Sequence, residues 1–226
     1  MDKSIFRELQ AKIDHETSLR DELSSRVETI DQESKVLRLL LGEFEISNNE
    51  TSIDITKSIE VIKVKIQELA KVASEHSYYK YVNVWDRAIQ EVACLTLLAA
   101  WRGALQGHED KKYQLLTLEQ VGQILNATLV PVYPEEVKFH ISIEEYLHGV
   151  LSISTELARL SVNAVIYGNK EVPLKSLQTI ENVHSSFQLL SLKNDSLRRH
   201  FDGLKYQLKR AEDVVYDMRI HNLLNE

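Results

Sequence analysis

Six cationic side chains gather near the C-terminal end of a chain that is acidic overall. The net charge is −7 at pH 7, yet residues 193–210 hold only two carboxylates, Asp195 and Asp202. The cations are Lys193, Arg198, Arg199, Lys205, Lys209 and Arg210. Cations at this density can neutralise phosphates and position a nucleic acid without reading its sequence. The alternative is a solvated helix face whose charges form weak pairs with a neighbouring helix.

A lone carboxylate interrupts the most apolar stretch of the chain. Residues 88–101 read AIQEVACLTLLAAW, and Glu91 is the one charged residue among them. A helix that is apolar nearly all round is buried on all sides. A buried carboxylate needs a partner, so Glu91 is a candidate for a functional or structural ion pair.

Sequence signatures of common enzymes are missing. There is no phosphate-cradling glycine loop, no nucleophile elbow and no His/Cys metal spacing. The eight histidines form no i, i+4 pair, and Cys94 is the single cysteine. One cysteine excludes an internal disulfide and a multi-cysteine zinc site. We therefore expect no metal site formed by these residue types.

The composition predicts an all-α chain of about seven helices forming one domain over residues 1–226. Seven glycines and three prolines leave little material for turns. In the first helix, apolar residues recur in steps of four and three up to Gly42, which predicts one face packed on another helix. These are Leu9, Ile13, Leu23, Val27, Ile30, Leu37 and Leu41. Arg20 occupies a seam position in the same register, where it either pairs across the seam or faces an internal cavity.

Local signals place the remaining helix ends. We expect a second helix from about Asp54 and a third from Ser77 to Gly107. Capping boxes at Thr117–Gln120 and Ser142–Glu145 open two further helices. Between these two helices, residues 126–140 carry two of the three prolines and are expected to form a loop. Gly168 follows the longer of these two helices. Pro173 opens the next helix, which runs to about Leu192. The last helix begins at Asn194 or Asp195.

The last helix carries a second seven-residue seam. It contains Leu197, Phe201, Leu204, Leu208, Ala211, Val215 and Met218. Such seams favour antiparallel bundle packing and a surface for another subunit. We expect Leu197, Leu204, Leu208, Val215 and Met218 to form an oligomer interface.

No apolar run approaches the roughly 18 residues of a membrane span, and no signal peptide opens the chain. We therefore expect no membrane partner and a reducing compartment: cytoplasm, nucleus or both.

Several segments resemble the translin family. They are YYKY…W at 78–85, IEEYLHGVL at 143–151, SVNAV at 161–165, LKNDSLRRHFDGLKYQLK at 192–209 and AEDVVYDMRI at 211–220. The resemblance covers essentially the whole chain. It implies an all-α protein that binds single-stranded RNA and DNA and assembles as an octamer, a closed barrel with its nucleic-acid contacts inside. It also implies a partner, Trax, with which translins form an endoribonuclease that acts on silencing passenger strands and tRNA fragments.

The resemblance assigns nucleic-acid contacts to two further regions. Arg20 matches an arginine that faces the interior of the barrel, and Lys80 keeps the leading cation of a basic segment in which Trp85 keeps the aromatic. Val82 and Val84 stand where histidines are usual, and Asp86 stands where a basic residue is common. A second basic region survives as Lys57, Lys63 and Lys65. The nucleic-acid-binding candidates are therefore Arg20, Lys80, Lys193, Arg198, Arg199, Lys205 and Lys209.

The resemblance also locates the counterpart of the catalytic carboxylates of Trax. The matching positions are Glu91, Cys94, Ser152 and Glu156, and only two of them are carboxylates. A thiol and a hydroxyl in place of carboxylates would hold Mg²⁺ poorly. We thus expect a non-catalytic scaffold subunit with no cofactor of its own, in which Glu91 and Glu156 are vestigial and Mg²⁺ acts only through the partner. The alternatives are a weak metal-dependent endoribonuclease and a structural coiled-coil adaptor without a nucleic-acid role.

Overall fold

The computed structural model describes residues 3–43, 50–127, 138–193 and 195–223. Its regular elements are all helical, which confirms the all-α prediction. They are α1 (Lys3–Glu43), α2 (Glu50–Ala73), α3 (Tyr78–Trp101), a 3₁₀ turn (Glu109–Lys111), α4 (Leu118–Leu125), α5 (Ile143–Ile166), α6 (Glu171–Gln188) and α7 (Ser196–Ile220).

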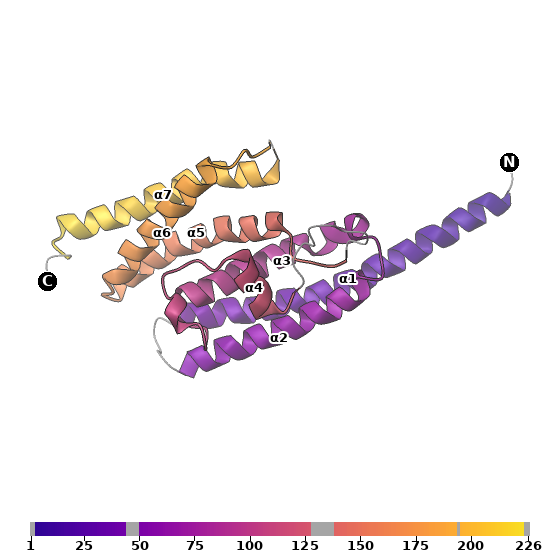
Figure 1. The fold of residues 1–226 in the computed structure, drawn as a ribbon, viewed down its shortest axis with the longest axis horizontal. Helices are drawn as coiled ribbons and strands as arrows, with labels where there is room; N and C mark the ends of the chain where they lie inside the picture. Colours follow the sequence, from indigo (N-terminus) through magenta and orange to yellow (C-terminus); the bar gives the residue numbers. More distant parts are fainter. Residues whose placement is uncertain (1–2, 44–49, 128–137, 194, 224–226) are drawn as a thin grey trace.

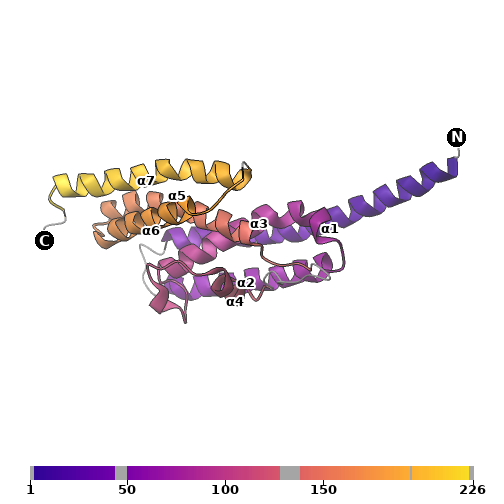
Figure 2. The same ribbon diagram turned by 45° about the horizontal axis from the view of Figure 1, so that its top comes forward.

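The long helices form two groups that meet along one face. Helices α1, α2 and α3 pack together, and α5, α6 and α7 form the second group (Figure 1). The two groups meet where α3 packs against α5, and the turned view shows the same division (Figure 2). Any site between the groups is therefore built mainly from α1, α3 and α5.

Helix α3 is the centre of the core, as its apolar sequence predicts. Every residue from Val92 to Trp101 is buried. Gly149 of α5 allows a close approach, because a Cβ there would lie 2.9 Å from the Ala93 Cβ and 3.1 Å from the Cys94 backbone nitrogen. A larger side chain at residue 149 would force α3 and α5 apart.

The seam of α1 is buried over only part of its length. Leu23, Ile30 and Leu37 are fully buried, whereas Leu9 and Ile13 are 48% and 58% exposed. The part of the seam that holds Leu9 and Ile13 is not covered within this chain, because the N-terminal part of α1 projects beyond the ends of α2 and α3 (Figure 1).

Most of the predicted helix ends are confirmed, and three shift. Both capping boxes form, Asp195 caps α7, and Gly168 follows α5 with φ +75°. Helix α2 begins at Glu50, four residues before the expected start, and α6 ends at Gln188. Helix α3 ends at Trp101 because Gly103 takes φ +69°, a left-handed conformation that ends an α-helix. Residues 128–137 of the expected loop lie outside the described residues.

Helix α5 is long and apolar enough, by length and composition, to cross a membrane. More than half of its apolar window (56%) is buried among the other helices. A buried core helix passes the same test, so this result does not indicate a membrane span.

The α7 seam that the sequence predicts as an oligomer interface is covered within its own chain. Leu197, Leu204, Val215 and Met218 are between 2% and 7% exposed, and Leu208 packs partly buried against the core. Helix α7 uses this seam to pack against α5 and α6 of its own chain. A seam of seven-residue period indicates that a helix has a partner, and here that partner is internal.

Candidate nucleic-acid interface

A polar groove runs between α1 and α3, where two stripes of side chains face each other. From α1 it is lined by Val27, Asp31, Ser34, Lys35 and Arg38. From α3 it is lined by Asn83, Val84, Arg87, Ala88, Gln90 and Glu91, and α5 adds Ser152. Residues three and four apart lie on one helix face, which is why each stripe is continuous. We call this site the α1–α3 groove; its volume is about 640 Å³.

Glu91 finds its partner at one end of this groove. The Arg38 guanidinium donates one hydrogen bond to Glu91 through Nη2 and one to Glu156 through Nη1. Arg38 thereby joins α1 to α3 and α5, and the guanidinium lies between the two carboxylates that the sequence singles out. Arg159 donates to the same Glu156 from Nε and Nη2, at 3.1 and 2.8 Å from Oε2.

The charges around Glu156 favour its ionised form. Burial opposes ionisation of Glu156, but the hydrogen bonds from Arg159 and Arg38 outweigh it and lower its pKa. Burial also lowers the affinity of Arg38 for its proton, yet the hydrogen bonds that it donates to both carboxylates raise its pKa overall. The result is a fixed cation that hydrogen-bonds to both side chains, Glu91 and Glu156.

The other two positions add no carboxylate. Cys94 is buried, and burial followed by the charges of Glu91 and Glu156 raises the pKa of its thiol. Ser152 lines the groove beside Glu91. In the part of the chain that the structure describes, no group of three or more His, Cys, Asp and Glu side chains could hold a metal ion. This donor set does not fit Mg²⁺, which prefers several oxygen ligands and water around it.

Arg20 and Lys80, the candidates on α1 and α3, converge on one aromatic ring. The Arg20 Cζ lies 5.2 Å and the Lys80 Nζ 5.5 Å from the centroid of Tyr81. Arg20 Nη2 donates to the Lys80 carbonyl oxygen at 3.4 Å, and Lys80 Nζ donates to Glu16. The hydrogen bond between Lys80 and Glu16 raises the pKa of Lys80 and lowers that of Glu16. The two cations form one exposed cluster that is already partly neutralised.

The rest of the segment after Lys80 is mainly structural. Trp85 is fully buried, so its ring cannot stack on a base without unfolding α3. Val82 and Val84 pack partly buried against the core. The cation at the end of this segment is Arg87, which lies in the α1–α3 groove beside the Asp86 that replaces a basic residue.

The second basic region, on α2, shows mixed charge. Lys57, Lys63 and Lys65 pair with Asp54, Glu60 and Glu68, each three residues away on the same helix. Exposed pairs of this kind add little stability and leave little net charge. This pattern favours a solvated face.

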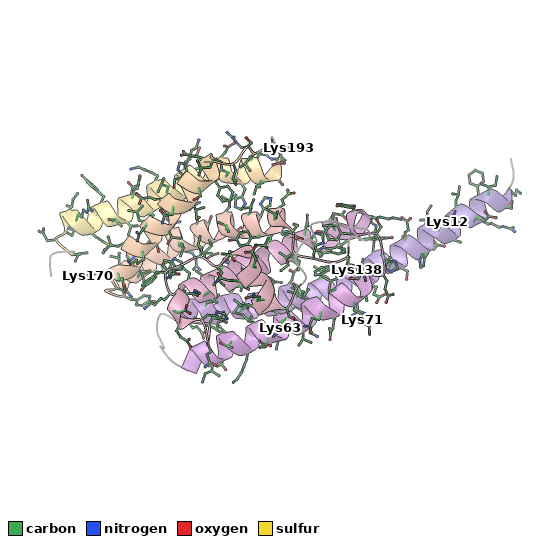
Figure 3. The ribbon with its side chains drawn as sticks, in the orientation of Figure 1. Lys12, Lys63, Lys71, Lys138, Lys170 and Lys193 are labelled. Atoms are coloured by element: carbon green, nitrogen blue, oxygen red, sulfur yellow. The ribbon has the colours of Figure 1, made fainter. Side chains whose placement is uncertain are left out.

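The cations of α7 and of the segment before it divide into paired and unpaired ones. Arg198 pairs with Asp202 at 3.0 Å, and Lys209 pairs with Asp213 at 2.7 Å. Lys205 Nζ lies 5.0 Å from the centroid of Tyr206. Arg199 is exposed and forms no ion pair with any described residue, and the same is true of Lys193, labelled just before α7 in Figure 3. Arg210 is also exposed and forms no ion pair with a described residue, so Lys193, Arg199 and Arg210 are free to bind phosphate.

A histidine pair fixes the first turns of α7 to α5. His148 Nδ1 lies 3.0 Å from His200 Nδ1, and His148 Nε2 lies 3.3 Å from the Ser196 hydroxyl. Burial lowers the pKa of both histidines, and for His200 the neighbouring His148 adds to the effect. Charges from Glu144, Asp195 and Asp86 oppose this shift of the pKa at His148.

The candidates therefore fall into separate sets. Arg20 and Lys80 lie on α1 and α3, and the α7 cations lie on a helix that packs against α5 and α6.

Three further cations, Lys35, Arg38 and Arg87, were not expected from the sequence. On α7, Arg198, Lys205 and Lys209 each directly follow a residue of the apolar seam. Lys35 and Arg38 stand in the same position on α1, after Ser34 and Leu37. Applying the same rule to α1 finds them.

Comparison with known proteins matches the chain to the Translin family over residues 18–222. Curated translins from Homo sapiens and Mus musculus are 35% identical to it over 98% of this chain and 94% of theirs. The fold is similar to that of the AfC3PO–duplex RNA complex, with TM-score 0.67 and 13% identity over 97% of this chain and 98% of that one. AfC3PO itself gives TM-score 0.65 and 15% identity over 96% of this chain and 98% of that one. The chain belongs to the Translin family.

Proposed function

We propose that this chain is a scaffold subunit that binds single-stranded RNA and DNA and has no nuclease activity of its own. It assembles with further copies of itself into an octamer, and with Trax into an endoribonuclease that processes passenger strands and tRNA fragments. It acts in the cytoplasm, the nucleus or both, and it needs no membrane. Mg²⁺ enters the reaction only through the Trax subunit.

The observation that carries the non-catalytic role is the position of Arg38. Hydrolysis of a phosphodiester by metal ions needs a cation that can bind water and the scissile phosphate. Between Glu91 and Glu156 the cation is instead a guanidinium, which has no open coordination position and does not lose its charge. The remaining donors are the buried Cys94 thiol and the Ser152 hydroxyl.

Exposed cations support nucleic-acid binding by a chain with net charge −7. Lys193 and Arg199 at the start of the C-terminal region, and Lys35 and Arg87 in the α1–α3 groove, form no ion pair with described residues. Unpaired cations release phosphate counterions on binding and give affinity that falls with salt. The similarity to AfC3PO, which was solved with duplex RNA, is consistent with RNA as the ligand.

Titration of a labelled single-stranded RNA at several salt concentrations, combined with light scattering, tests the proposal. We expect binding that weakens with salt, a mass of several subunits for the chain alone, and cleavage only after Trax is added. A chain that shows no salt-dependent RNA binding would be the coiled-coil adaptor instead. That outcome has some physical support, because Arg198 and Lys209 already pair within α7.

A further inference from the structure

We propose that the α1–α3 groove binds a single unpaired base of the nucleic acid, with the flanking phosphate held by Lys35 and Arg87. This inference rests on the proposed function and adds the part of the ligand that the groove takes. The groove, at about 640 Å³, is within the size range of small-molecule sites, about 300–1,000 Å³. A nucleotide therefore fits, whereas a duplex does not.

The groove has the three surfaces that a nucleotide needs. Val27 of α1 with Val84 and Ala88 of α3 form an apolar wall for the face of a base. A base that has left its stack can pack against apolar as well as aromatic side chains. Val84 is a valine where the family usually has histidine, so the wall at this position is apolar in this chain.

The side-chain amides of Asn83 and Gln90 supply the hydrogen-bonding groups. Both line the groove, and neither forms a side-chain hydrogen bond with any described residue. An amide presents a donor and an acceptor together, which suits the edge of a base. At the floor of the groove, the Ser34 hydroxyl is also buried without a partner among the described residues.

Two cations stand at the rim beside these amides. Arg87 lies between Asn83 and Gln90 along the same face of α3, and Lys35 lies opposite on α1. The carboxyl of Asp31 interacts electrostatically with Lys35 and Arg87. Burial raises the pKa of Asp31, and the charges of Lys35 and Arg87 oppose that rise. Arg38 is engaged by Glu91 and Glu156, so Lys35 and Arg87 are left for a phosphate.

An experiment that measures base recognition distinguishes the proposed base site from a site that binds phosphate alone. The probe is a short single strand, compared with the same strand in which every base is replaced by a tetrahydrofuran abasic unit. Both carry the same phosphates, so charge alone predicts equal affinity. We expect the wild-type chain to bind the base-bearing strand roughly fivefold more tightly, the lower end of the range that stacking on an aromatic side chain gives per base, because the wall here is aliphatic.

Variants test whether the preference for the base-bearing strand arises in the α1–α3 groove. Val84→Glu should place a charge on the apolar wall and bring the affinity for the base-bearing strand close to that for the abasic strand. Val64→Glu, at an exposed valine of α2 outside the groove, adds the same charge and should leave the preference for the base-bearing strand unchanged. The double variant Asn83→Ala with Gln90→Ala removes groups on the surface of α3 and gives a second measurement if Val84→Glu fails to fold.

The outcomes distinguish the inference from the function on which it rests. Equal affinity of the wild type for both strands, or an unchanged preference in Asn83→Ala with Gln90→Ala, overturns the base site but leaves nucleic-acid binding intact. Failure of both strands to bind overturns the proposed function and the base site together.

Discussion

Arg38 and Glu156 are 118 residues apart in the sequence and form a direct ion pair in the structure. The same guanidinium bonds to Glu91 of α3, so one side chain of α1 connects both helix groups of the chain. The Glu156 side chain is 13% exposed, which makes this pair better shielded from solvent than the pairs on the helix surfaces. The ion pairs of Arg38 therefore bear on the stability of the chain and on the chemistry available to Glu91 and Glu156.

Replacing Arg38 should destabilise the chain. Arg38→Met leaves Glu91 without its cation and Glu156 with Arg159 alone. Because the Arg38 side chain is 40% exposed, solvent screens part of the loss, and we expect a decrease of about 1–3 kcal/mol in the free energy of unfolding. Urea denaturation measures it. Lys57→Met, which removes an exposed pair on α2, is the control and should cost less than about 0.5 kcal/mol.

The histidine pair predicts a pH effect with a definite sign. Burial holds the pKa of His148 and His200 below that of the unfolded chain, so the neutral pair contributes stability above about pH 6.5. This contribution is lost as the pH falls below that value toward the folded pKa values, because the unfolded chain then binds more protons.

Comparing the pH dependence of unfolding free energy in the wild type and in His200→Gln isolates the contribution of the histidine pair. Burial raises the pKa of Glu145 to about 7, so that group changes stability in the opposite direction over the same pH range. His200→Gln removes one titrating ring and leaves Glu145 unchanged. Between pH 7.5 and 5.5, a range of about one unit on either side of the histidine value, we expect the variant to lose less unfolding free energy than the wild type. Parallel pH curves for the wild type and His200→Gln would contradict the assignment.

Truncation of the α7 seam should act on folding and not on assembly. Leu204 is 2% exposed within its own chain, so Leu204→Ala should cost about 2–5 kcal/mol of unfolding free energy. At temperatures where the variant remains folded, light scattering should give the same number of subunits as the wild type. If Leu204→Ala dissociates the oligomer without lowering the free energy of unfolding, the seam forms the subunit interface instead.

The two neighbouring arginines of α7 should differ in their effect on RNA. Arg199 forms no ion pair with described residues, whereas Arg198 is held by Asp202 at 3.0 Å. We expect Arg199→Glu to weaken single-stranded RNA binding more than Arg198→Glu does. The slope of log affinity against log salt should become shallower by about 0.7 for each phosphate that the variant no longer neutralises. Equal, unchanged slopes in both variants would identify this face as merely solvated.

Local signals in the sequence located most of the helices. The capping boxes at Thr117 and Ser142, the cap at Asp195 and the glycine after α5 depend on interactions within a few residues, so they could be predicted. The end of α3 was misplaced because an apolar run continues past Trp101 while Gly103 adopts a left-handed conformation.

Partners across the fold could not be predicted in the same way. The α7 seam shows that the helix is covered, but not whether α5 or another subunit covers it. Glu91 was recognised as needing a partner, yet Arg38, 53 residues away, becomes that partner only through the packing of α1 on α3.

We propose that this subunit holds RNA and does not cut it. The direct measurement is the fate of an end-labelled single-stranded RNA incubated with the purified chain and Mg²⁺, with the bound fraction measured in the same sample. We predict bound, intact RNA, with cleavage appearing when Trax is added and persisting when this chain carries Glu156→Gln. Cleavage by this chain alone that is blocked by EDTA and lost in Glu156→Gln would contradict the account, because the Arg38-bridged carboxylates would then be a working nuclease site.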